Sequence, residues 1–430
     1  MKCIASRSTR VAYTGERQHL YRAGAWLFFA LSFFASIAAT AETLTLDRAL
    51  ELAERGSPRL RGADAMVAQA RSGIVVSHQY PNPEIEIAAG QTRARVVGAL
   101  PGSTQSLSIS QTVDLPSIRE PRRRTAEAGL AVSEHARNEI IISVLADVRQ
   151  TFYEALRRRA ELELAEDTVK LLQQVRNRVE VRVRVGEAPR FELLRADSEL
   201  LVAVSATERA RLRVSQAIAE LRQAIGAPLP VEFTPEGELS AGILVPELPS
   251  LRDQMNARHP GLAQARAQVE QARRRIETER ALRTSQPIVR AGFDQDPELR
   301  QWRIGVALPV PIWNRREGQV GEAIAGLTLA EQAFEQRRIE LDALLEVAFS
   351  RHRIASRQAN TLKSVVSQAE AALQVAEAAY RFGERGIFEV IDGQRTLRTV
   401  RLELLNARFD QQAALIDLER MRATDLGSKQ

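Results

Sequence analysis

Cysteine is almost absent from this sequence, and neither charge sign clearly prevails. The one cysteine, Cys3, lies close to the N-terminus, so the chain after it has neither disulfides nor thiolate metal sites. The formal net charge is +6, but residues 1–41 hold five basic residues and one acidic residue. The rest of the chain has 55 basic and 53 acidic residues, which interleave along its length. This pattern predicts a solvated surface and no nucleic-acid partner.

The usual signatures of catalysis and of cofactor binding are also missing. The sequence contains no Gly-rich phosphate loop and no nucleophile elbow. His78, His135, His259 and His352 are far apart and form no metal-binding pair at helical spacing. We therefore expect no catalytic residues, no metal and no cofactor, and we expect that the protein is not an enzyme.

The N-terminal segment Met1 to Ala41 has the three parts of a secretory signal peptide. Lys2 and four arginines precede the apolar run "AWLFFALSFFASIAA", and the small residues "ATA" follow it. A retained membrane anchor is the alternative, because the run approaches the ~18 residues that span a bilayer. No later segment is apolar enough to cross a membrane as a helix, so the sequence predicts an exported protein whose membrane crossing would need strands.

An internal repeat organises the remaining chain. Residues 57–74 match residues 259–276 at nine of eighteen positions, at an offset of 202. Farther along the offset becomes 197, so that Gly186 pairs with Gly383 and Phe191 with Phe388. We expect a first repeat at 42–226, a Pro- and Gly-rich linker at 227–250 and a second repeat at 251–427, each with a helix, two strands and a long helical hairpin.

Each half contains a 56-residue stretch without glycine or proline, residues 130–185 and 327–382. A helix of that length is roughly 84 Å long, which predicts a coiled coil, a bundle or a duct. Apolar and small residues recur in steps of three and four from Leu362 to Tyr380, from Leu397 to Met421 and, in the first half, from Leu200 to Ala224. The hairpin turns are predicted at "VGEAP" (Val185 to Pro189) and "FGERG" (Phe382 to Gly386).

Short segments with period-two alternation precede the long helices. Four strands are predicted in "PEIEIAA", "SLSISQTV", "PIVRAGFD" and "WRIGVALPV", apolar on one face and small or polar on the other. Surface hairpins on a soluble protein are the alternative. In a transmembrane wall the lipid-facing residues are Leu107, Ile109, Val113, Trp302, Ile304, Val306 and Leu308. Four strands cannot close a barrel, and open edges are not tolerated in lipid, so we expect three copies to share twelve strands.

These features resemble the TolC-like outer membrane efflux proteins. The resemblance covers essentially all of the chain after the signal segment. It is carried by the duplicated architecture, by "GVALPVPIWNRREGQVGEA" and by "AYRFGERGIFEVIDGQRTLRTVRLELLNAR". Within that family, "LPVPIWNRREGQ" looks most like the branch that serves heavy-metal cation exporters. In the first half, "VDLPSIREP" departs from the branch, whose members tend to carry a Gly-Gly-Lys-Arg-like turn there.

The resemblance implies a homotrimeric channel-tunnel, mainly α-helical with a small β part, in the outer membrane and the periplasm. It implies an exit duct that is joined to a periplasmic adaptor (membrane fusion protein) and an inner-membrane transporter of the RND type. Acids after the second turn, Glu389 and Asp392, then form a ring at the narrowest point. Tyr380, Arg385 and Glu192 hold the tip shut. Gly186, Pro189, Gly383 and Gly386 shape the turns that contact the adaptor.

Elementary electrostatics agrees with the predicted ring. Three copies of two acids around one axis attract cations and raise one another's carboxyl pKa. The alternative is that these acids merely favour a helix N-terminus. For the whole protein, the alternatives are a periplasmic coiled-coil adaptor or a structural protein of an export system. An adaptor should have one hairpin and Gly-rich strand domains, whereas here the hairpin occurs twice.

Overall fold

The computed structural model describes residues 42–93, 95, 97–98, 100–230, 233–239 and 245–423. The predicted signal peptide, residues 1–41, lies outside the described residues, as do parts of the predicted linker. The described residues from Thr43 onward belong to one compact unit.

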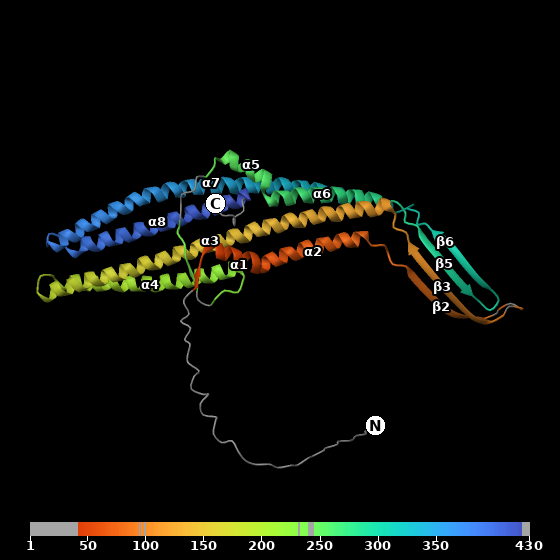
Figure 1. The fold of residues 1–430 in the computed structure, drawn as a ribbon, viewed down its shortest axis with the longest axis horizontal. Coiled ribbons are helices and arrows are strands. Elements are labelled where there is room, and N and C mark those ends of the chain that lie inside the picture. Colours follow the sequence, from red (N-terminus) through yellow and green to blue (C-terminus); the bar gives the residue numbers. More distant parts are fainter. Residues whose placement is uncertain are drawn as a thin grey trace, which may run out of the picture. The chain divides into compact units, whose positions relative to one another are not determined.

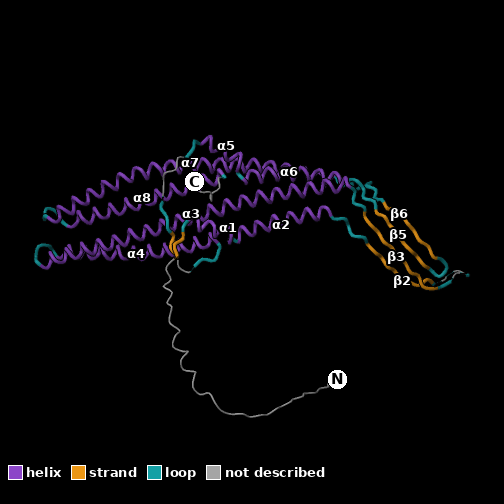
Figure 2. Tube along the Cα trace, viewed as in Figure 1, coloured by secondary structure: helices purple, strands orange, loops and turns teal. Residues whose placement is uncertain are grey.

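The same order of elements occurs in both halves of this unit, as Figures 1 and 2 show. Two helices lead to two strands, and two very long helices follow. The first half contains α1 (Leu46–Gly56), α2 (Pro58–His78), β2 (Glu84–Thr92), β3 (Gly102–Thr112), α3 (Pro116–Arg184) and α4 (Arg190–Ile225). The second contains α5 (Leu248–Arg258), α6 (Pro260–Ala281), β5 (Ile288–Gln295), β6 (Arg300–Ala307), α7 (Glu317–Arg381) and α8 (Ile387–Arg422). Strand β1 (Glu42–Leu44) pairs with β4 (Phe233–Pro235) in a separate small sheet.

The first helix of each hairpin is longer than its stretch without glycine and proline. Helix α3 has 69 residues and α7 has 65, which corresponds to roughly 100 Å at 1.5 Å per residue. Gly129 and Gly326 therefore lie inside helices, and Pro121 lies in the second turn of α3. A glycine weakens a helix by only about 1 kcal/mol, so the packing along such long elements outweighs it.

Helix α3 connects the two halves, since it contacts α2 and α4 of its own half and α6 and α8 of the other. Buried apolar residues gather in several clusters along the helices. One is centred on Phe152 and Leu221 near α1, and another on Leu341 and Met255 near α5. A third joins α3, α7 and α8 close to the hairpin turns. Among the described residues, no helix is long and apolar enough to cross a membrane.

The larger sheet has the strand order β2-β3-β5-β6, and every neighbouring pair is antiparallel. The sheet lies at one end of the long helices and the two hairpin turns lie at the other (Figure 1). Strands β2 and β6 form its edges, and neither pairs on its outer side with another described strand.

Candidate functional site at the hairpin tips

Both hairpin turns lie at the residues that the sequence predicts, and the two are closed in the same way. Gly186 and Gly383 follow the ends of α3 and α7 in the left-handed region, with φ of +82° and +75°. The N–H of Glu187 donates to the carbonyl of Arg182, and the N–H of Glu384 to that of Ala379. The N–H of Gly186 donates to the carbonyl of Val183, and the N–H of Gly383 to that of Tyr380. Together these hydrogen bonds form a Schellman motif at the end of each helix.

The helices that leave the turns begin with matching residues. Pro189 and Gly386 occupy the N-cap positions of α4 and α8. Glu192 and Glu389 follow in the first turns, where the helix dipole favours negative charge. One residue before each acid, Phe191 and Phe388 place their ring centroids 5.9 Å apart, so the two tips of one chain touch.

The predicted latch residues lie at the tips, but within one chain they do not all meet. The Arg385 guanidinium lies 3.6 Å from the Glu389 carboxylate, and both side chains are largely exposed. No ion pair between Arg385 and Glu192 is present among the described residues. The hydroxyl of Tyr380 and Oε2 of Glu192 are buried and have no hydrogen-bond partner in the described chain. Two polar atoms of the predicted latch are thus buried and unsatisfied in the single chain.

The Tyr380 side chain is held by a guanidinium over its ring and by an apolar cluster around it. Its ring lies under the Arg182 guanidinium, 4.8 Å from the ring centroid, and only 8% of the residue is exposed. It belongs to the cluster in which Val175 and Val179 of α3 pack against Ile387 and Val390 of α8. Asp392, in contrast, is exposed at the second turn of α8, and no hydrogen bond or ion pair within the described chain engages its carboxylate. The tip therefore combines an apolar contact between hairpins with an open acidic surface.

The sheet at the other end has two chemically distinct faces. Ile87, Leu107, Phe293 and Trp302 stand in register across all four strands, and so do Ile85, Ile109, Ala291 and Ile304. The large apolar members of both rows are exposed, up to 77% for Ile87. The opposite face carries the rows Glu86, Ser108, Gly292, Arg303 and Glu84, Ser110, Arg290, Gly305.

Two residues of the predicted lipid-facing set lie just outside the strands. Strand β3 ends at Thr112 and β6 at Ala307, so Val113 and Leu308 follow the strand ends. The N–H of Val113 still donates to the Pro287 carbonyl, 2.8 Å away. After Leu308, Pro309 has no N–H to offer to a strand ladder. Both side chains nevertheless remain exposed, and their contact with lipid stays a prediction.

A family model for outer membrane efflux proteins matches residues 49–227 and 251–424. The chain belongs to the outer membrane efflux protein family. The predicted family is thereby confirmed, and the observed elements have the predicted mainly α-helical character with a small β part. The protein is an outer-membrane exit duct of an efflux system, and its family and fold are those of channel proteins.

Several known outer membrane efflux proteins resemble this one along most of its length. It is 25% identical over 388 residues to the cobalt-zinc-cadmium resistance protein CzcC of Cupriavidus metallidurans, covering 88% of this chain and 90% of CzcC. It is 24% identical over 400 residues to the pyoverdine export outer membrane protein OpmQ of Pseudomonas putida, covering 87% and 84%. The Campylobacter jejuni CmeC outer membrane channel has the same fold, with a TM-score of 0.76 at 14% identity, covering 89% and 86%.

Sequence reasoning missed a buried acid where the sheet of this efflux protein meets its helices. The Asp114 side chain is fully buried between β3 and α3 and accepts hydrogen bonds from Arg122, at 3.2 and 3.4 Å, and from Gln286, at 3.0 Å. Gln286 precedes β5, so this contact ties the strand–helix junctions of both halves together. The departing motif "VDLPSIREP" contains this acid, but nothing in its local spacing indicates a partner 172 residues away.

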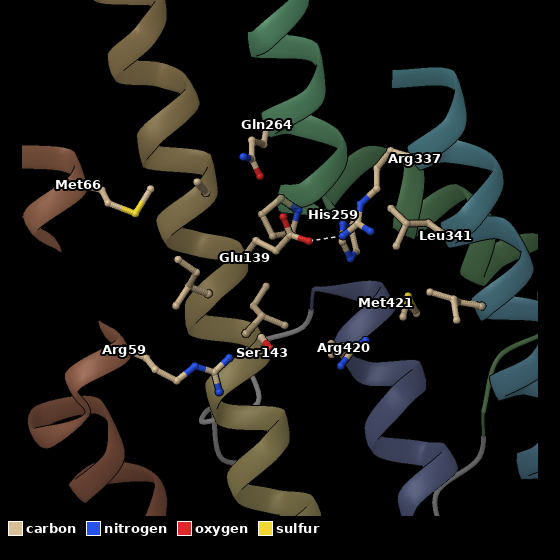
Figure 3. A pocket seen from close by; sticks show the side chains of 15 residues that line it. Arg59, Met66, Glu139, Ser143, His259, Gln264, Arg337, Leu341, Arg420 and Met421 are labelled. Atoms are coloured by element: carbon tan, nitrogen blue, oxygen red, sulfur yellow. Dashed lines mark hydrogen bonds and ion pairs between the residues drawn. The ribbon is translucent and has the colours of Figure 1, made fainter. Parts of the chain in front are cut away.

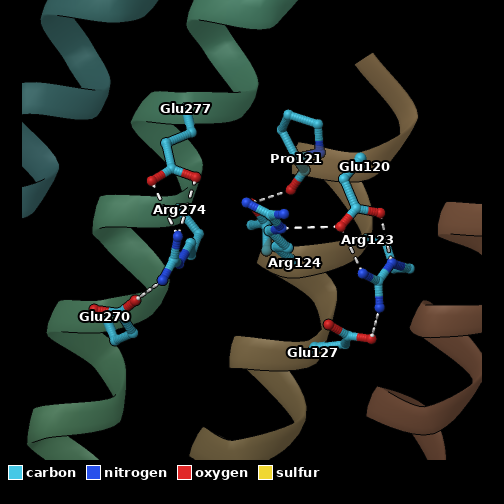
Figure 4. Close-up of polar contacts among 9 residues, drawn as sticks. Glu120, Pro121, Arg123, Arg124, Glu127, Glu270, Arg274 and Glu277 are labelled. Atoms are coloured by element: carbon cyan, nitrogen blue, oxygen red, sulfur yellow. Dashed lines mark hydrogen bonds and ion pairs between the residues drawn. The ribbon is translucent and has the colours of Figure 1, made fainter. Parts of the chain in front are cut away.

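The neighbouring run Arg122-Arg123-Arg124, in the second and third turns of α3, is largely paired. Figure 4 shows Arg123 between Glu120 and Glu127, and Arg124 on Glu120. These hydrogen bonds, first that from Arg123, lower the pKa of the Glu120 carboxyl to about 2. On α6, Arg274 likewise pairs with Glu270 and Glu277 (Figure 4). The run thus stabilises its own helix surface.

A cavity of about 500 Å³ lies among α2, α3, α6, α7 and α8, far along the chain from the hairpin turns. Figure 3 shows Glu139 and Arg337 paired beside His259, with Arg420 of α8 lower in the view. His259 caps α6 by accepting the N–H of Gly261 at Nδ1, 3.1 Å away. Its burial, and then the Arg337 and Arg420 charges, lower the pKa of this imidazole to about 4. Among the described residues, no group of three or more His, Cys, Asp or Glu side chains could hold a metal ion.

Proposed function

We propose that three copies of the chain close one β-barrel of twelve strands in the outer membrane. The two-faced sheet is the observation that carries this proposal. Its apolar face suits contact with the lipid of the outer membrane, and its opposite face offers serine, glycine and charged side chains to water. The unpaired edges β2 and β6 need partners in lipid, and a second copy supplies the complementary edge.

In this trimer the long helices continue the duct through the periplasm, with six hairpin tips around one axis. Glu389 and Asp392 form the acid ring at the narrowest point. Asp392 is exposed and has no hydrogen-bond or ion-pair partner among the described residues, which supports this role. Three copies of each acid gather negative charge around one axis and concentrate cations at the opening.

Tyr380, Arg385 and Glu192 act as the latch of the gate. The unsatisfied hydroxyl of Tyr380 and the unsatisfied Oε2 of Glu192 support this role, because buried polar atoms rarely stay without partners. Assembly, or a small movement of the tips, brings a donor to Glu192. Arg385 is free to turn from its exposed pair with Glu389 to an acid of the neighbouring hairpin, since such pairs contribute only ~0–1 kcal/mol.

The tip turns receive the periplasmic adaptor, and an inner-membrane transporter of the RND type supplies the energy. Gly186, Pro189, Gly383 and Gly386 set the shape of the contact. Val185 and Phe382, which precede the two glycines, are 63% and 81% exposed, and so offer apolar side chains to a partner. The duct itself is passive.

Heavy-metal cations are the proposed substrate class. The "LPVPIWNRREGQ" resemblance, the similarity to CzcC and the acid pair at the tip support this choice. A strain that lacks the protein should become more sensitive to zinc, cobalt or cadmium, and the intact gene should restore growth. Sensitivity to organic toxins alone would contradict the metal assignment and leave the duct in place.

Fractionation and bilayer recording test the duct itself. We expect a trimer in detergent extracts of the outer membrane, and that trimer should form cation-selective channels in planar bilayers. Recovery in the osmotic-shock fluid, without channel activity, would instead favour a periplasmic adaptor or a structural coiled-coil protein.

A further inference from the structure

A carboxylate on the first hairpin is bound by a guanidinium on the second, two turns away from the tips. Nε of Arg395 on α8 donates to Oε2 of Glu199 on α4 at 3.2 Å, and Nη2 of Arg395 donates to Oε1. Nη2 of Arg195, one turn earlier on α4, lies 3.4 Å from the same Oε1. The carboxylate is thus held from both hairpins.

The environment of this pair differs from that of the surface ion pairs around it. Glu199 is buried, with 10% of its side chain exposed. Asp197, which pairs with Arg176 inside the first hairpin, has 40% of its side chain exposed. Glu370, which pairs with Arg401 inside the second hairpin, has 43% exposed. Because burial removes water that would otherwise compete, the Glu199 pair is coupled more strongly to the arrangement of the helices.

The position of the pair along the helices links it to the tips. The other hydrogen bonds and ion pairs that join α3 to α8, Arg157 with Asn406 and Arg149 with Glu419, lie farther along α8 from the turns. Arg395 lies eight residues after α8 begins, which is ~12 Å from that end at 1.5 Å per residue. Among the described residues, this is the ion pair between the two hairpins that lies nearest the turns.

Arg395 also fixes the orientation of the α8 turn that carries the acids of the predicted ring. Asp392 precedes it by three residues, which on an α-helix is a rise of ~4.5 Å and a rotation of about 60°. With Arg395 held against α4, the turn of α8 that carries Glu389 and Asp392 cannot rotate or slide without breaking the pair. A swing of the second hairpin away from the first breaks it too.

We propose that Glu199 and Arg395 form a tie within each chain that positions the acid-bearing turn of α8 and holds the two hairpins together in the closed gate. The inference rests on the proposed gate at Glu389 and Asp392. It adds a pair distinct from the latch at Tyr380, Arg385 and Glu192, and it requires no second copy of the chain.

Single-channel recording of the full-length protein in planar bilayers tests the tie. Glu199→Gln keeps the size of the side chain and removes its charge. We expect the open probability to rise by about tenfold, between the effects of exposed and of fully buried pairs. Asp197→Asn removes the same charge two residues away from a pair inside one hairpin, and should leave gating unchanged. The Glu199→Asp variant keeps the charge, so its channel should stay closed.

The partner residue supplies the second arm of the experiment. Arg395→Gln should open the channel as Glu199→Gln does, and the double variant should open it no further, because both changes break one contact. Arg395 is the more exposed partner, so its variant keeps the test valid if Glu199→Gln does not assemble. Gating unchanged in Arg395→Gln, or additive in the double variant, overturns the tie.

A failed tie and a failed gate give different results. If Tyr380→Phe with Arg385→Ser opens the channel while Glu199→Gln and Arg395→Gln do not, the gate stands and the tie is wrong. If none of these variants opens it and the acids do not affect cation block, the proposed gate itself is wrong.

Discussion

Phe191 and Phe388 meet at the tips of the two hairpins, with ring centroids 5.9 Å apart and an angle of 32° between the ring planes. They are 197 residues apart in the chain and occupy the same place in the two repeats. The internal duplication therefore provides the tip with a contact between two equivalent side chains. Both rings remain about half exposed, so the contact stays accessible to a partner as well.

Replacing either phenylalanine by alanine should loosen the tips. We expect Phe191→Ala and Phe388→Ala each to raise the mean conductance in planar bilayers, and the double variant to add little. An aromatic pair stabilises a contact by ~0.5–1.5 kcal/mol beyond the effect of its buried area. A double-mutant cycle of the two single variants and the double variant isolates this coupling. Phe382→Ala is the control, because Phe382 is 81% exposed and has no ring partner among the described residues. Strict additivity of the two changes would show that the rings act independently.

The sequence predicts the hairpin turns to the residue because their determinants are local. A glycine in the left-handed region after a long periodic stretch is sufficient to end α3 at Arg184 and α7 at Arg381. The beginnings of the same helices are less predictable. Gly129 and Gly326 resemble helix ends but lie inside, because their local penalty is small beside the packing of neighbouring helices.

Contacts between the hairpins have no comparable local signal. Glu199 and Arg395 are 196 residues apart, and their meeting depends on how α4 and α8 are rotated against each other. Nothing in either helix distinguishes them from other charged residues at helical spacing. Similarly, Arg385 contacts Glu389 of its own helix in the single chain, although the family resemblance pairs it with Glu192. Residue identity predicts which groups can pair, and packing decides which ones do.

The acid ring predicts a specific electrical phenotype. Glu389→Ala with Asp392→Ala should abolish block by multivalent cations and lower cation selectivity, because six carboxylates leave the opening of the proposed trimer. Planar-bilayer recordings at low salt give the clearest contrast, since salt screens the exposed charges. Glu370→Gln serves as the control, because Glu370 pairs with Arg401 inside the second hairpin. Unchanged block would remove the case for the ring.

The latch predicts a change in conductance. Tyr380→Phe with Arg385→Ser removes one buried hydroxyl and one exposed guanidinium, so the closed tip loses two groups that can bind acids. We expect higher conductance, with the trimer still recovered from the outer membrane. Tyr380→Phe alone separates the hydroxyl from the ring, which keeps its place under Arg182. A double variant that conducts like the wild type contradicts the latch.

Alanine substitutions should lower stability at the turn glycines and raise it at a glycine inside a helix. Gly186→Ala or Gly383→Ala should lower stability by about 1–2 kcal/mol, because φ near +80° is unfavourable for a residue with a Cβ. Gly326→Ala should raise it by about 1 kcal/mol, since this glycine lies inside α7 with open space around its Cα. The midpoint of thermal unfolding of the detergent-solubilised protein measures both. A shift in the same direction for all three would contradict the assignment of the turns.

His259 gives the protein a predictable loss of stability in acid. The folded protein holds this imidazole neutral, with a pKa of about 4 against an ordinary value of 6.5, because burial and then Arg337 and Arg420 disfavour its charged form. The unfolded chain binds a proton below pH 6.5 and the folded chain does not, so stability should fall as the pH drops from 6.5 to 4. The pKa difference between 6.5 and about 4 corresponds to a loss of about 3 kcal/mol in the free energy of unfolding.

Thermal unfolding midpoints measured in detergent between pH 6.5 and 4 give the slope of stability against pH. His259→Asn keeps a side-chain oxygen that can accept the Gly261 N–H and removes the titration, so its curve should be flatter between pH 6.5 and 4. His78→Asn is the matched control, because His78 is exposed at the end of α2, and it should keep the wild-type slope. Below pH 4 the folded chain also binds the proton, and this residue should contribute no further loss. Equal slopes in the His259→Asn variant and the wild type would assign the acid sensitivity to other groups.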